Sequence, residues 1–239
     1  MVSDTAIHRE NRLLAALPPE SLALLGADLK LVSLPQGAVI YEPGSAVDHI
    51  FFPQTGMISL LVVTKNGGSI ETMTVGREGA VGLHGAFGGR RSLTRATAQM
   101  GGRFSTIPAV RFGQVMCEDA PLREMVSHYT EVMLAEAQQI CACNAVHDSN
   151  SRLCRWLLQS ADRTASERLP LTQEFLAQML GVRRTTVTLL AQALQKKGFI
   201  KYSRGQISIL DRAGLENEAC ECYQVIQHER LPGMLGVKF

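Results

Sequence analysis

The distribution of apolar and polar positions divides the chain into a strand-rich first part and a helical second part. Between residues 29 and 100, short segments rich in β-branched and apolar side chains alternate with turns containing Gly, Pro, Asn and Asp. The KNGG sequence at 65–68 separates two such segments and predicts a hairpin. Many short strands at regular spacing predict a small barrel or sandwich. A short helix, a Pro-Pro break and a second helical turn over 11–26 precede the strands.

From about Pro108 the hydrophobic period becomes helical. A short helix is predicted over 108–119, and a long one over 122–146 has apolar residues at every third or fourth position. Such a stripe suits a helix that packs on a domain or on a twin helix. We predict a first domain, a connecting helix and a second domain with a C-terminal helical tail, at 1–120, 121–148 and 150–239.

The segment 171–200 predicts two short helices around a tight turn. Thr172 is placed to cap the first helix, and Gly181 allows the turn. The second helix buries apolar residues at helical spacing, namely Val187, Leu190, Ala191 and Leu194. Its outward face then consists of Arg184, Thr185, Thr188, Leu189 and Gln192.

A polar loop is expected before this helix pair, over 164–170, and a hairpin after it. FIKYS, an Arg-Gly turn and QISIL form the hairpin, with Lys201 and Arg204 near its tip. A helix-turn-helix followed by such a hairpin is a winged helix, whose wing cations usually hold phosphates without reading sequence.

Composition is ordinary for a water-soluble globular protein, with 46% hydrophobic and 19% charged residues among 239. The first thirty residues contain no apolar run of signal-peptide type, and no segment approaches the roughly 18 apolar residues of a membrane span. We therefore expect a cytoplasmic protein without a membrane partner.

Charge is unevenly distributed, with a net −3 over 1–149 and a net +5 over 150–239. Residues 183–212 contain seven basic residues and one acid, which suggests a polyanion partner such as nucleic acid; charge alone leaves a solvated basic face without a partner as an equal alternative. Arg183 and Arg184 at a helix N-terminus oppose the macrodipole at a cost of roughly 0.3–1 kcal/mol each. Phosphates or guanine edges at that position would account for them.

These motifs resemble those of the Crp/Fnr family of bacterial transcription regulators. RLCRWLL, LTQEFLAQMLGVRRTTV, the GFI entry to the wing and ISILDRAGLE, within 150–215, resemble the family's DNA-binding domain. Residues 13–115 resemble its β-roll and 121–147 its dimerisation helix. The resemblance implies an α+β fold: an N-terminal β-roll (a double-stranded β-helix of cyclic-nucleotide-binding type), a long dimerisation helix and a C-terminal winged helix-turn-helix.

The resemblance also implies a homodimer that reads a palindromic site in double-stranded DNA, with RNA polymerase as a further partner. The residues expected to contact DNA are Thr172, Arg183, Arg184, Thr185, Thr188, Leu189, Gln192, Lys201 and Arg204. The residues expected at the dimer contact are Met125, Tyr129, Val132, Met133 and Ile140.

The recognition helix departs from the family pattern at two positions. Many members read their half-site with a Glu and an Arg, where this chain has Thr185 and Leu189. Both side chains can meet thymine methyl groups instead. We therefore predict a half-site different from the family's well-known ones, with Arg184 kept as a basic contact.

The sensor region departs as well. Cyclic-AMP-binding members have a Glu after a glycine and an Arg further on, which pair with the ribose and the cyclic phosphate. Here Leu83 follows Gly82, and Ser92 or Leu93 stands at the Arg position, although Arg95 lies close. We expect no cyclic-nucleotide cofactor.

Other effectors are weakly supported by the sequence. His84 could ligate a haem iron, but an ordinary loop histidine accounts for it more simply. No Cys precedes Cys117, which excludes an iron–sulfur cluster on N-terminal cysteines. A candidate effector pocket consists of Gly82, Leu83, His84 and Arg95, with its ligand unknown.

The six cysteines predict no metal site. Cys141 and Cys143 lie two apart on the long helix and point about 200° apart. Cys220 and Cys222 would do the same if the tail is helical. The simplest interpretation of these four cysteines is that they are small buried residues. The alternative is a redox switch through Cys141 or Cys143 across the dimer.

Catalysis is not expected. Only His49 and His84 lie in the strand region, and the sequence has no nucleophile motif and no GxxxxGK phosphate loop. The alternatives to an effector-independent regulator are a ligand- or redox-gated sensor of the same fold and a winged helix used for protein–protein contact.

Overall fold

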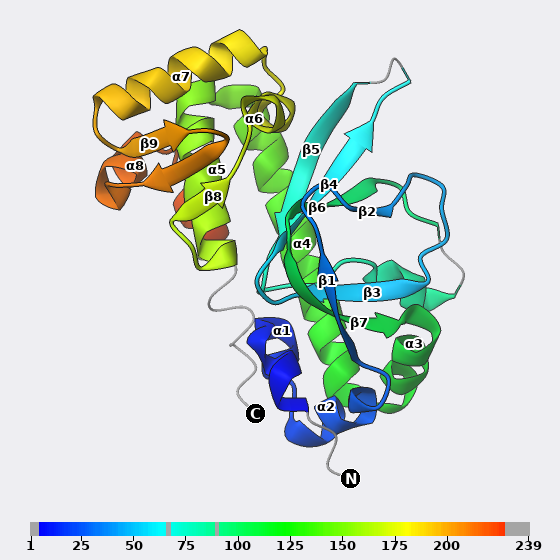
Figure 1. The fold of residues 1–239 in the computed structure, drawn as a ribbon. Helices are drawn as coiled ribbons and strands as arrows, with labels where there is room; N and C mark the ends of the chain where they lie inside the picture. Colours follow the sequence, from blue (N-terminus) through cyan, green and yellow to red (C-terminus); the bar gives the residue numbers. More distant parts are fainter. Residues whose placement is uncertain (1–4, 66–67, 89–90, 228–239) are drawn as a thin grey trace.

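The computed structural model describes residues 5–65, 68–88 and 91–227, and one long helix runs beside both of its α/β units (Figure 1). The end of the predicted helical tail, 228–239, lies outside the described residues. Within the described part of the chain, no helix combines the length and the apolarity that a membrane span requires.

The N-terminal unit is a β-roll of two antiparallel sheets. One sheet has the strand order β1-β7-β3, and the other has the order β2-β6-β4-β5. Strands β4 and β5 pair antiparallel on either side of the KNGG sequence, which confirms the predicted hairpin. The strands are β1 (Lys30–Leu34), β2 (Val39–Tyr41), β3 (His49–Pro53), β4 (Met57–Val63), β5 (Ser69–Val75), β6 (Arg95–Met100) and β7 (Gly102–Pro108).

Strand β7, which the sequence pattern did not single out, is the middle strand of its sheet. Phe104 and Ile107 on this strand are fully buried. Short helices close the open end of the roll, and the rings of Phe52 and Phe112 lie 6.0 Å apart there. These helices are η1 (Thr5–Glu10), α1 (Arg12–Ala15), α2 (Pro19–Gly26), η2 (Leu83–Phe87) and α3 (Ala109–Glu118).

The long predicted helix is α4 (Ala120–Val146), and the side chain of Asp119 caps it by accepting a hydrogen bond from the Leu122 amide at 2.9 Å. Its apolar stripe packs against the chain's own β-roll. The hydroxyl of Tyr129 accepts a hydrogen bond of 3.0 Å from the Ala80 amide, on the β-roll side.

This packing changes the interpretation of the predicted dimer residues. Tyr129, Val132 and Ile140 are buried within the single chain, and Met125 and Met133 are half-buried against the same core. An amphipathic helix buries its apolar stripe on whichever surface is available, and here that surface is the β-roll. The side of α4 that is open to a partner is therefore the opposite one.

The C-terminal unit contains the predicted helix pair and hairpin. Its three-stranded sheet has the order β8-β10-β9, so residues 168–170 of the predicted polar loop are instead a strand, paired with the hairpin. Pairing with β10 accounts for this difference, and Leu169 is buried in the paired strand. The elements are α5 (Ser149–Thr164), β8 (Arg168–Pro170), α6 (Gln173–Leu180), α7 (Arg184–Lys196), β9 (Ile200–Ser203), β10 (Gln206–Ile209) and α8 (Arg212–Glu218).

Polar contacts join the two units. The α5 residue Arg163 is buried and forms ion pairs with Glu136 on α4 and with Glu78 of the β-roll. Helix α6 lies beside β5 in Figure 1, where the side chain of Gln178 donates a hydrogen bond to Ser69. The winged unit is therefore held against both the β-roll and α4.

Candidate nucleic-acid interface

The relative position of α6 and α7 is set by a cap and a turn. The hydroxyl of Thr172 accepts a hydrogen bond of 3.2 Å from the Phe175 amide, as predicted for the start of α6. Gly181 ends the helix in the left-handed region at φ +66°, and its amide donates to the carbonyl of Ala177. The turn then begins α7 after Arg183.

Helix α7 has one buried and one exposed face. Val187, Ala191 and Leu194 are fully or almost fully buried, whereas Leu189 is 67% exposed. The predicted outward residues are all exposed or half-buried: Arg184, Thr185, Thr188, Leu189 and Gln192. A single exposed leucine is ordinary on a protein surface, so it is the cations beside Leu189 that mark this face as a candidate contact surface.

Gln173 is a residue of this surface that sequence reasoning missed. Its side-chain oxygen accepts hydrogen bonds from the Nε of Arg184 at 3.3 Å and from the hydroxyl of Thr188 at 3.2 Å. The side chain therefore orients two candidate contact residues from the first turn of α6. Its position directly after the capping Thr172 was the available signal.

The seven basic residues of 183–212 divide into two groups, according to whether they form an ion pair. Lys197 forms an ion pair with Glu218 at 2.6 Å, and Arg212 forms ion pairs with three carboxylates. The charges of both residues are therefore balanced within the chain. In the part of the chain that the structure describes, the other five form no ion pair; they are Arg183, Arg184, Lys196, Lys201 and Arg204.

The wing has the turn geometry that the sequence predicts. Arg204 and Gly205 both have positive φ, at 50° and 75°, as a two-residue type I′ hairpin turn requires. Arg204 is exposed at the tip, and Lys201 is exposed on β9.

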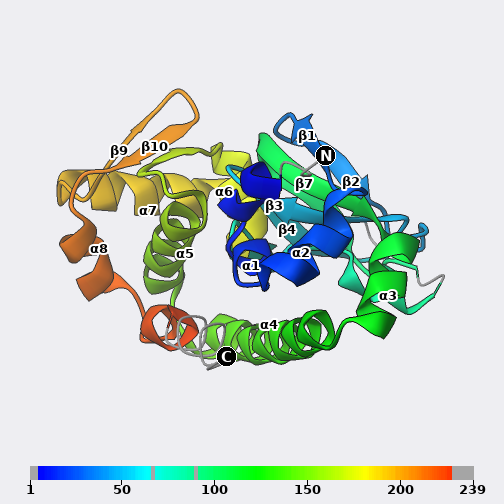
Figure 2. The same cartoon turned by 90° about the horizontal axis from the view of Figure 1, so that it is seen from below.

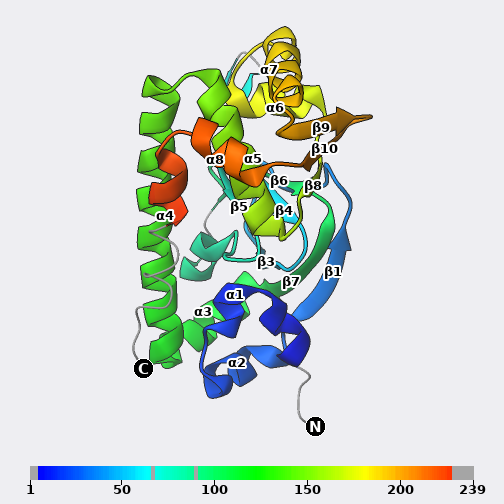
Figure 3. The same ribbon diagram turned by 90° about the vertical axis from the view of Figure 1, so that its left-hand side faces the viewer.

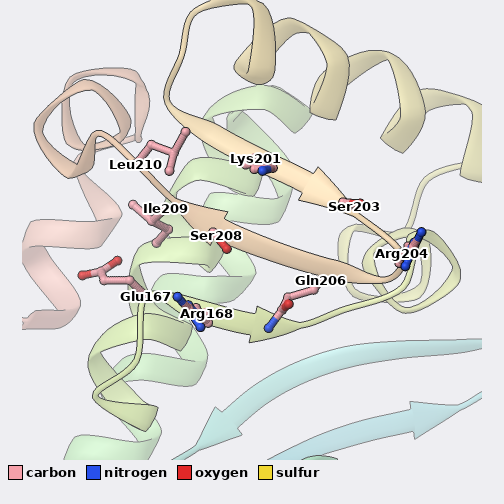
Figure 4. Close-up of a pocket in the computed structure, with 9 residues that line it drawn as sticks. All are labelled: Glu167, Arg168, Lys201, Ser203, Arg204, Gln206, Ser208, Ile209 and Leu210. Carbon is pink, nitrogen blue, oxygen red and sulfur yellow. The ribbon is translucent and has the colours of Figure 1, made fainter.

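Arg168 adds a third cation to the wing. In the sheet register, Ser208 on β10 lies between Lys201 on β9 and Arg168 on β8. Figure 4 shows these three residues together with Arg204 and Gln206 along a groove of the sheet. Cations, hydroxyls and an amide in one row are groups that bind phosphate oxygens. Since β8 was expected to be a loop, sequence reasoning did not place Arg168 here.

The candidate effector residues of the β-roll have internal roles. Leu83 is 8% exposed and belongs to the core beside the α3 helix. Gly82 has φ +95°, and a Cβ there would lie 2.6 Å from the hydroxyl of Tyr41. Arg95 forms an ion pair of 2.9 Å with Glu42 at the surface.

His84 is half-buried in η2, next to Leu83. The position after Gly82 is thus filled by a core leucine, and Arg95 is paired with a carboxylate of the same unit.

Comparisons with known proteins agree with this architecture. A model of the cyclic nucleotide-binding domain matches residues 31–119, and a model of the Crp-like helix-turn-helix domain matches residues 151–218. The chain belongs to the Crp/Fnr family of transcription regulators. Among curated protein sequences, none matches the chain significantly.

Three solved structures illustrate the similarity. A CRP/FNR family regulator from Thermus thermophilus has 25% identity and a TM-score of 0.66, over 80% of this chain and 98% of that one. A Crp/Fnr family protein from Eubacterium rectale has 19% identity and a TM-score of 0.68, over 88% and 98%. FixK2 from Bradyrhizobium japonicum has 16% identity and a TM-score of 0.69, over 80% and 98%; the last two comparisons show the fold alone.

Proposed function

We propose that this Crp/Fnr-type DNA-binding regulator acts as a homodimer that reads a roughly palindromic site without cyclic AMP. Helix α7 of each subunit enters the major groove, and the wing binds phosphates beside it. The observation that carries this proposal is the grouping of cations without ion pairs, among the described residues, at the start of α7 and along the wing. Binding to chromosomal DNA would place the protein in the cytoplasm.

Sequence reading rests on the exposed face of α7. Arg184 can donate to guanine, and Gln173 holds its guanidinium in place. Thr185 and Leu189 present methyl groups, which suit thymine. A half-site that combines a guanine with neighbouring thymines fits these side chains, with Arg183, Thr172, Thr188 and Gln192 around them.

The same charges argue against a winged helix that contacts only proteins. A protein interface usually excludes charge from its centre, whereas phosphate binding requires cations. DNA affinity that falls steeply with salt would separate the two functions. Contact with RNA polymerase, which family membership suggests, needs a separate transcription assay.

The outer side of α4 supplies the dimer surface in this proposal. Leu134 is 60% exposed and lies opposite buried Val132 and Glu136 on the helix. Exposed residues follow the helix above and below it at heptad-like spacing, and they are Ser127, Thr130, Gln138, Cys141 and Ala145. Two parallel copies of this stripe would bring identical residues together about a twofold axis.

In vitro selection from a random DNA pool tests the proposal, using the purified full chain with no added ligand. A palindromic motif with half-site centres one helical turn apart would support a dimer that is competent without an effector. Failure to enrich any sequence at low salt, followed by enrichment when cyclic AMP is added, would overturn the effector-independent part. Failure under both conditions would overturn DNA reading by α7.

A further inference from the structure

Four metal-binding side chains meet where the C-terminal segment returns to α4. Cys143 lies in the last turn of α4, His147 is the residue directly after that helix, and Cys220 and Cys222 come from the segment after α8. Their ligand atoms all lie within 4.8 Å of one another. Figures 2 and 3 show the segment after α8 lying beside α4.

Local backbone geometry explains this convergence. Cys143 and His147 are four residues apart, so they share one face at the end of α4. Helix α8 ends at Glu218, Cys220 is not helical, and the next helical turns begin at Cys222. The condition under which Cys220 and Cys222 would point apart, a continuous helix through both, is therefore not met.

We propose that Cys143, His147, Cys220 and Cys222 form a Cys₃His site for a zinc-class divalent cation. Each of the four side chains would supply one ligand atom, in a closed tetrahedral arrangement typical of structural sites. This site is separate from the DNA-reading surface, and its metal binding does not depend on the proposed function.

The distances fit a single ion. With Zn–S near 2.3 Å and Zn–N near 2.0–2.1 Å, tetrahedral ligands lie about 3.8 Å apart for two sulfurs and about 3.6 Å apart for sulfur and nitrogen. The sulfurs of Cys143 and Cys220 are 3.5 Å apart, and the Cys222 sulfur is 3.6 Å from the Nδ1 of His147. In an iron–sulfur cluster the four protein ligands are distributed over two or four irons and cannot all lie this close together, which favours one ion over a cluster.

Ligand chemistry narrows the ion further. Thiolate and imidazole ligands select zinc and similar borderline or soft ions, whereas calcium and magnesium require oxygen ligands. Cys143, Cys220 and Cys222 are at most 7% exposed, so water has little access to the sulfurs. A closed site of this kind holds structure and leaves no position for a substrate.

Neighbouring side chains support the ligands. The other ring nitrogen of His147, Nε2, lies 3.2 Å from the carboxylate of Glu221, which is the carboxylate–histidine arrangement common in metal sites. The amide of Gln139 donates to the sulfur of Cys222 at 3.0 Å. Glu221 is thus a positioning residue for the histidine.

A buried positive charge beside the four side chains also favours a bound metal with thiolate ligands. Arg155 is 5% exposed and, among the described residues, has no ion-pair partner. Its positive charge acts on Cys143 and Cys220. Three thiolates and one divalent ion carry a net −1, which would compensate a buried guanidinium.

The site would tie the end of α4 to the winged unit across the break at Asp148. Its ligands come from both sides of that break, so a bound ion would limit rotation of the DNA-binding unit relative to α4. This consequence, unlike metal binding itself, rests on the proposed function. The expected result is that zinc changes DNA affinity while the chain stays folded.

Cobalt titration of the reduced, metal-free full chain tests the site directly. One equivalent of Co²⁺ per chain should give the intense visible bands of tetrahedral cobalt and the near-ultraviolet thiolate bands, and one equivalent of Zn²⁺ should abolish them. Metal analysis after dialysis should give one zinc per chain. Binding far below one equivalent, or bands of octahedral cobalt, would overturn the proposal.

Variants distinguish these ligands from other thiols. Cys143→Ser and Cys222→Ser should remove the bands, whereas Cys141→Ser, an exposed cysteine two residues along the same helix, should keep them. Glu221→Gln should keep the bands but weaken zinc affinity about 10- to 100-fold. Circular dichroism of each variant shows whether the chain has folded. If thiol counting instead shows that Cys143 and Cys220 form a disulfide in air, and the chain binds no metal after that disulfide is reduced, the proposal fails.

DNA binding is measured separately on the same samples. If zinc binds stoichiometrically and DNA affinity is unchanged, the site is structural and the link to the DNA-binding unit is wrong. If neither sample binds the selected DNA, the proposed function fails while the metal site stands on its own data.

Discussion

The indole Nε1 of Trp156 on α5 donates a hydrogen bond of 2.7 Å to the carboxyl of Glu71 on β5. The hydroxyl of Ser59 donates to the other oxygen of the same carboxyl. Glu71 and Trp156 are both buried, at 7% and 4% exposure. A buried acid on the β-roll is therefore a polar link to the first helix of the DNA-binding unit, and changes in its protonation reach both units.

This carboxyl predicts a pH-dependent stability. Burial raises the pKa of Glu71 from 4.5 to about 7, against the opposing effects of its hydrogen bonds and of Arg163 and Arg155. The folded chain therefore keeps a proton that the unfolded chain releases between these values, and the free energy of unfolding falls as pH rises through that range. The Glu71 contribution amounts to about 3 kcal/mol.

Glu71→Gln removes this titration while keeping an oxygen that can accept from Trp156. Urea unfolding at a series of pH values from 5 to 8 should show a flatter profile for Glu71→Gln than for the unsubstituted protein. Glu42→Gln, a change at the surface of the same unit, should keep the original slope. Parallel profiles for Glu71→Gln and the unsubstituted chain would show that Glu71 does not carry the extra proton.

Arg184 is predicted to carry sequence specificity. Arg184→Ala should weaken binding to the selected site by about 1–3 kcal/mol, roughly 5- to 150-fold, and should relax the preference at one position of each half-site. Lys197→Ala is the matched control, because that cation at the other end of the same helix pairs with Glu218. Repeating the selection with each variant checks both results. An unchanged motif for Arg184→Ala would assign reading to other residues.

The wing is predicted to contribute affinity without specificity. Arg168→Ala and Lys201→Ala should each weaken binding equally for matched and mismatched DNA, and each should reduce the slope of log K against log salt by about 1. Lys30→Ala, an exposed cation on β1, should leave the slope unchanged. A change in base preference for either wing variant would mean that the wing reads bases.

Local signals were sufficient for the helix pair and the wing. The capping Thr172, the turn at Gly181 and the Arg204–Gly205 turn each act through neighbours in the sequence, so the sequence predicts them. Strand β8 could not be predicted in this way, because its three residues are strand only through pairing with β10.

The other differences between the sequence prediction and the structure involve residues that are far apart in the sequence and meet only in the fold. The apolar stripe of α4 indicates burial but does not identify what covers it, and the β-roll, rather than a second chain, covers Tyr129. The cysteine cluster joins residues 77 positions apart, Cys143 and Cys220. The one local sign of that cluster was the spacing of four residues between Cys143 and His147. The sequence prediction missed it because it considered cysteines only together with other cysteines.

The outer stripe of α4 predicts a specific oxidative cross-link. In a twofold parallel pair of α4 helices, Cys141 of each chain would face its counterpart, since it shares the side of Leu134. Mild oxidation should therefore give a covalent dimer, and Cys141→Ser should abolish it. Cys117, which is also exposed but lies before α4, should remain reduced in that dimer.

Leu134→Glu tests the same surface without oxidation. Two carboxylates forced together at a helix interface repel each other and lose the apolar contact, so the chain should sediment as a monomer and bind one half-site weakly. Val110→Glu, at an exposed valine of α3, should remain dimeric. A dimeric Leu134→Glu that still cross-links through Cys141 would mean that Leu134 lies at the edge of the interface, whereas a dimer without the cross-link would place the partner on another face of the molecule.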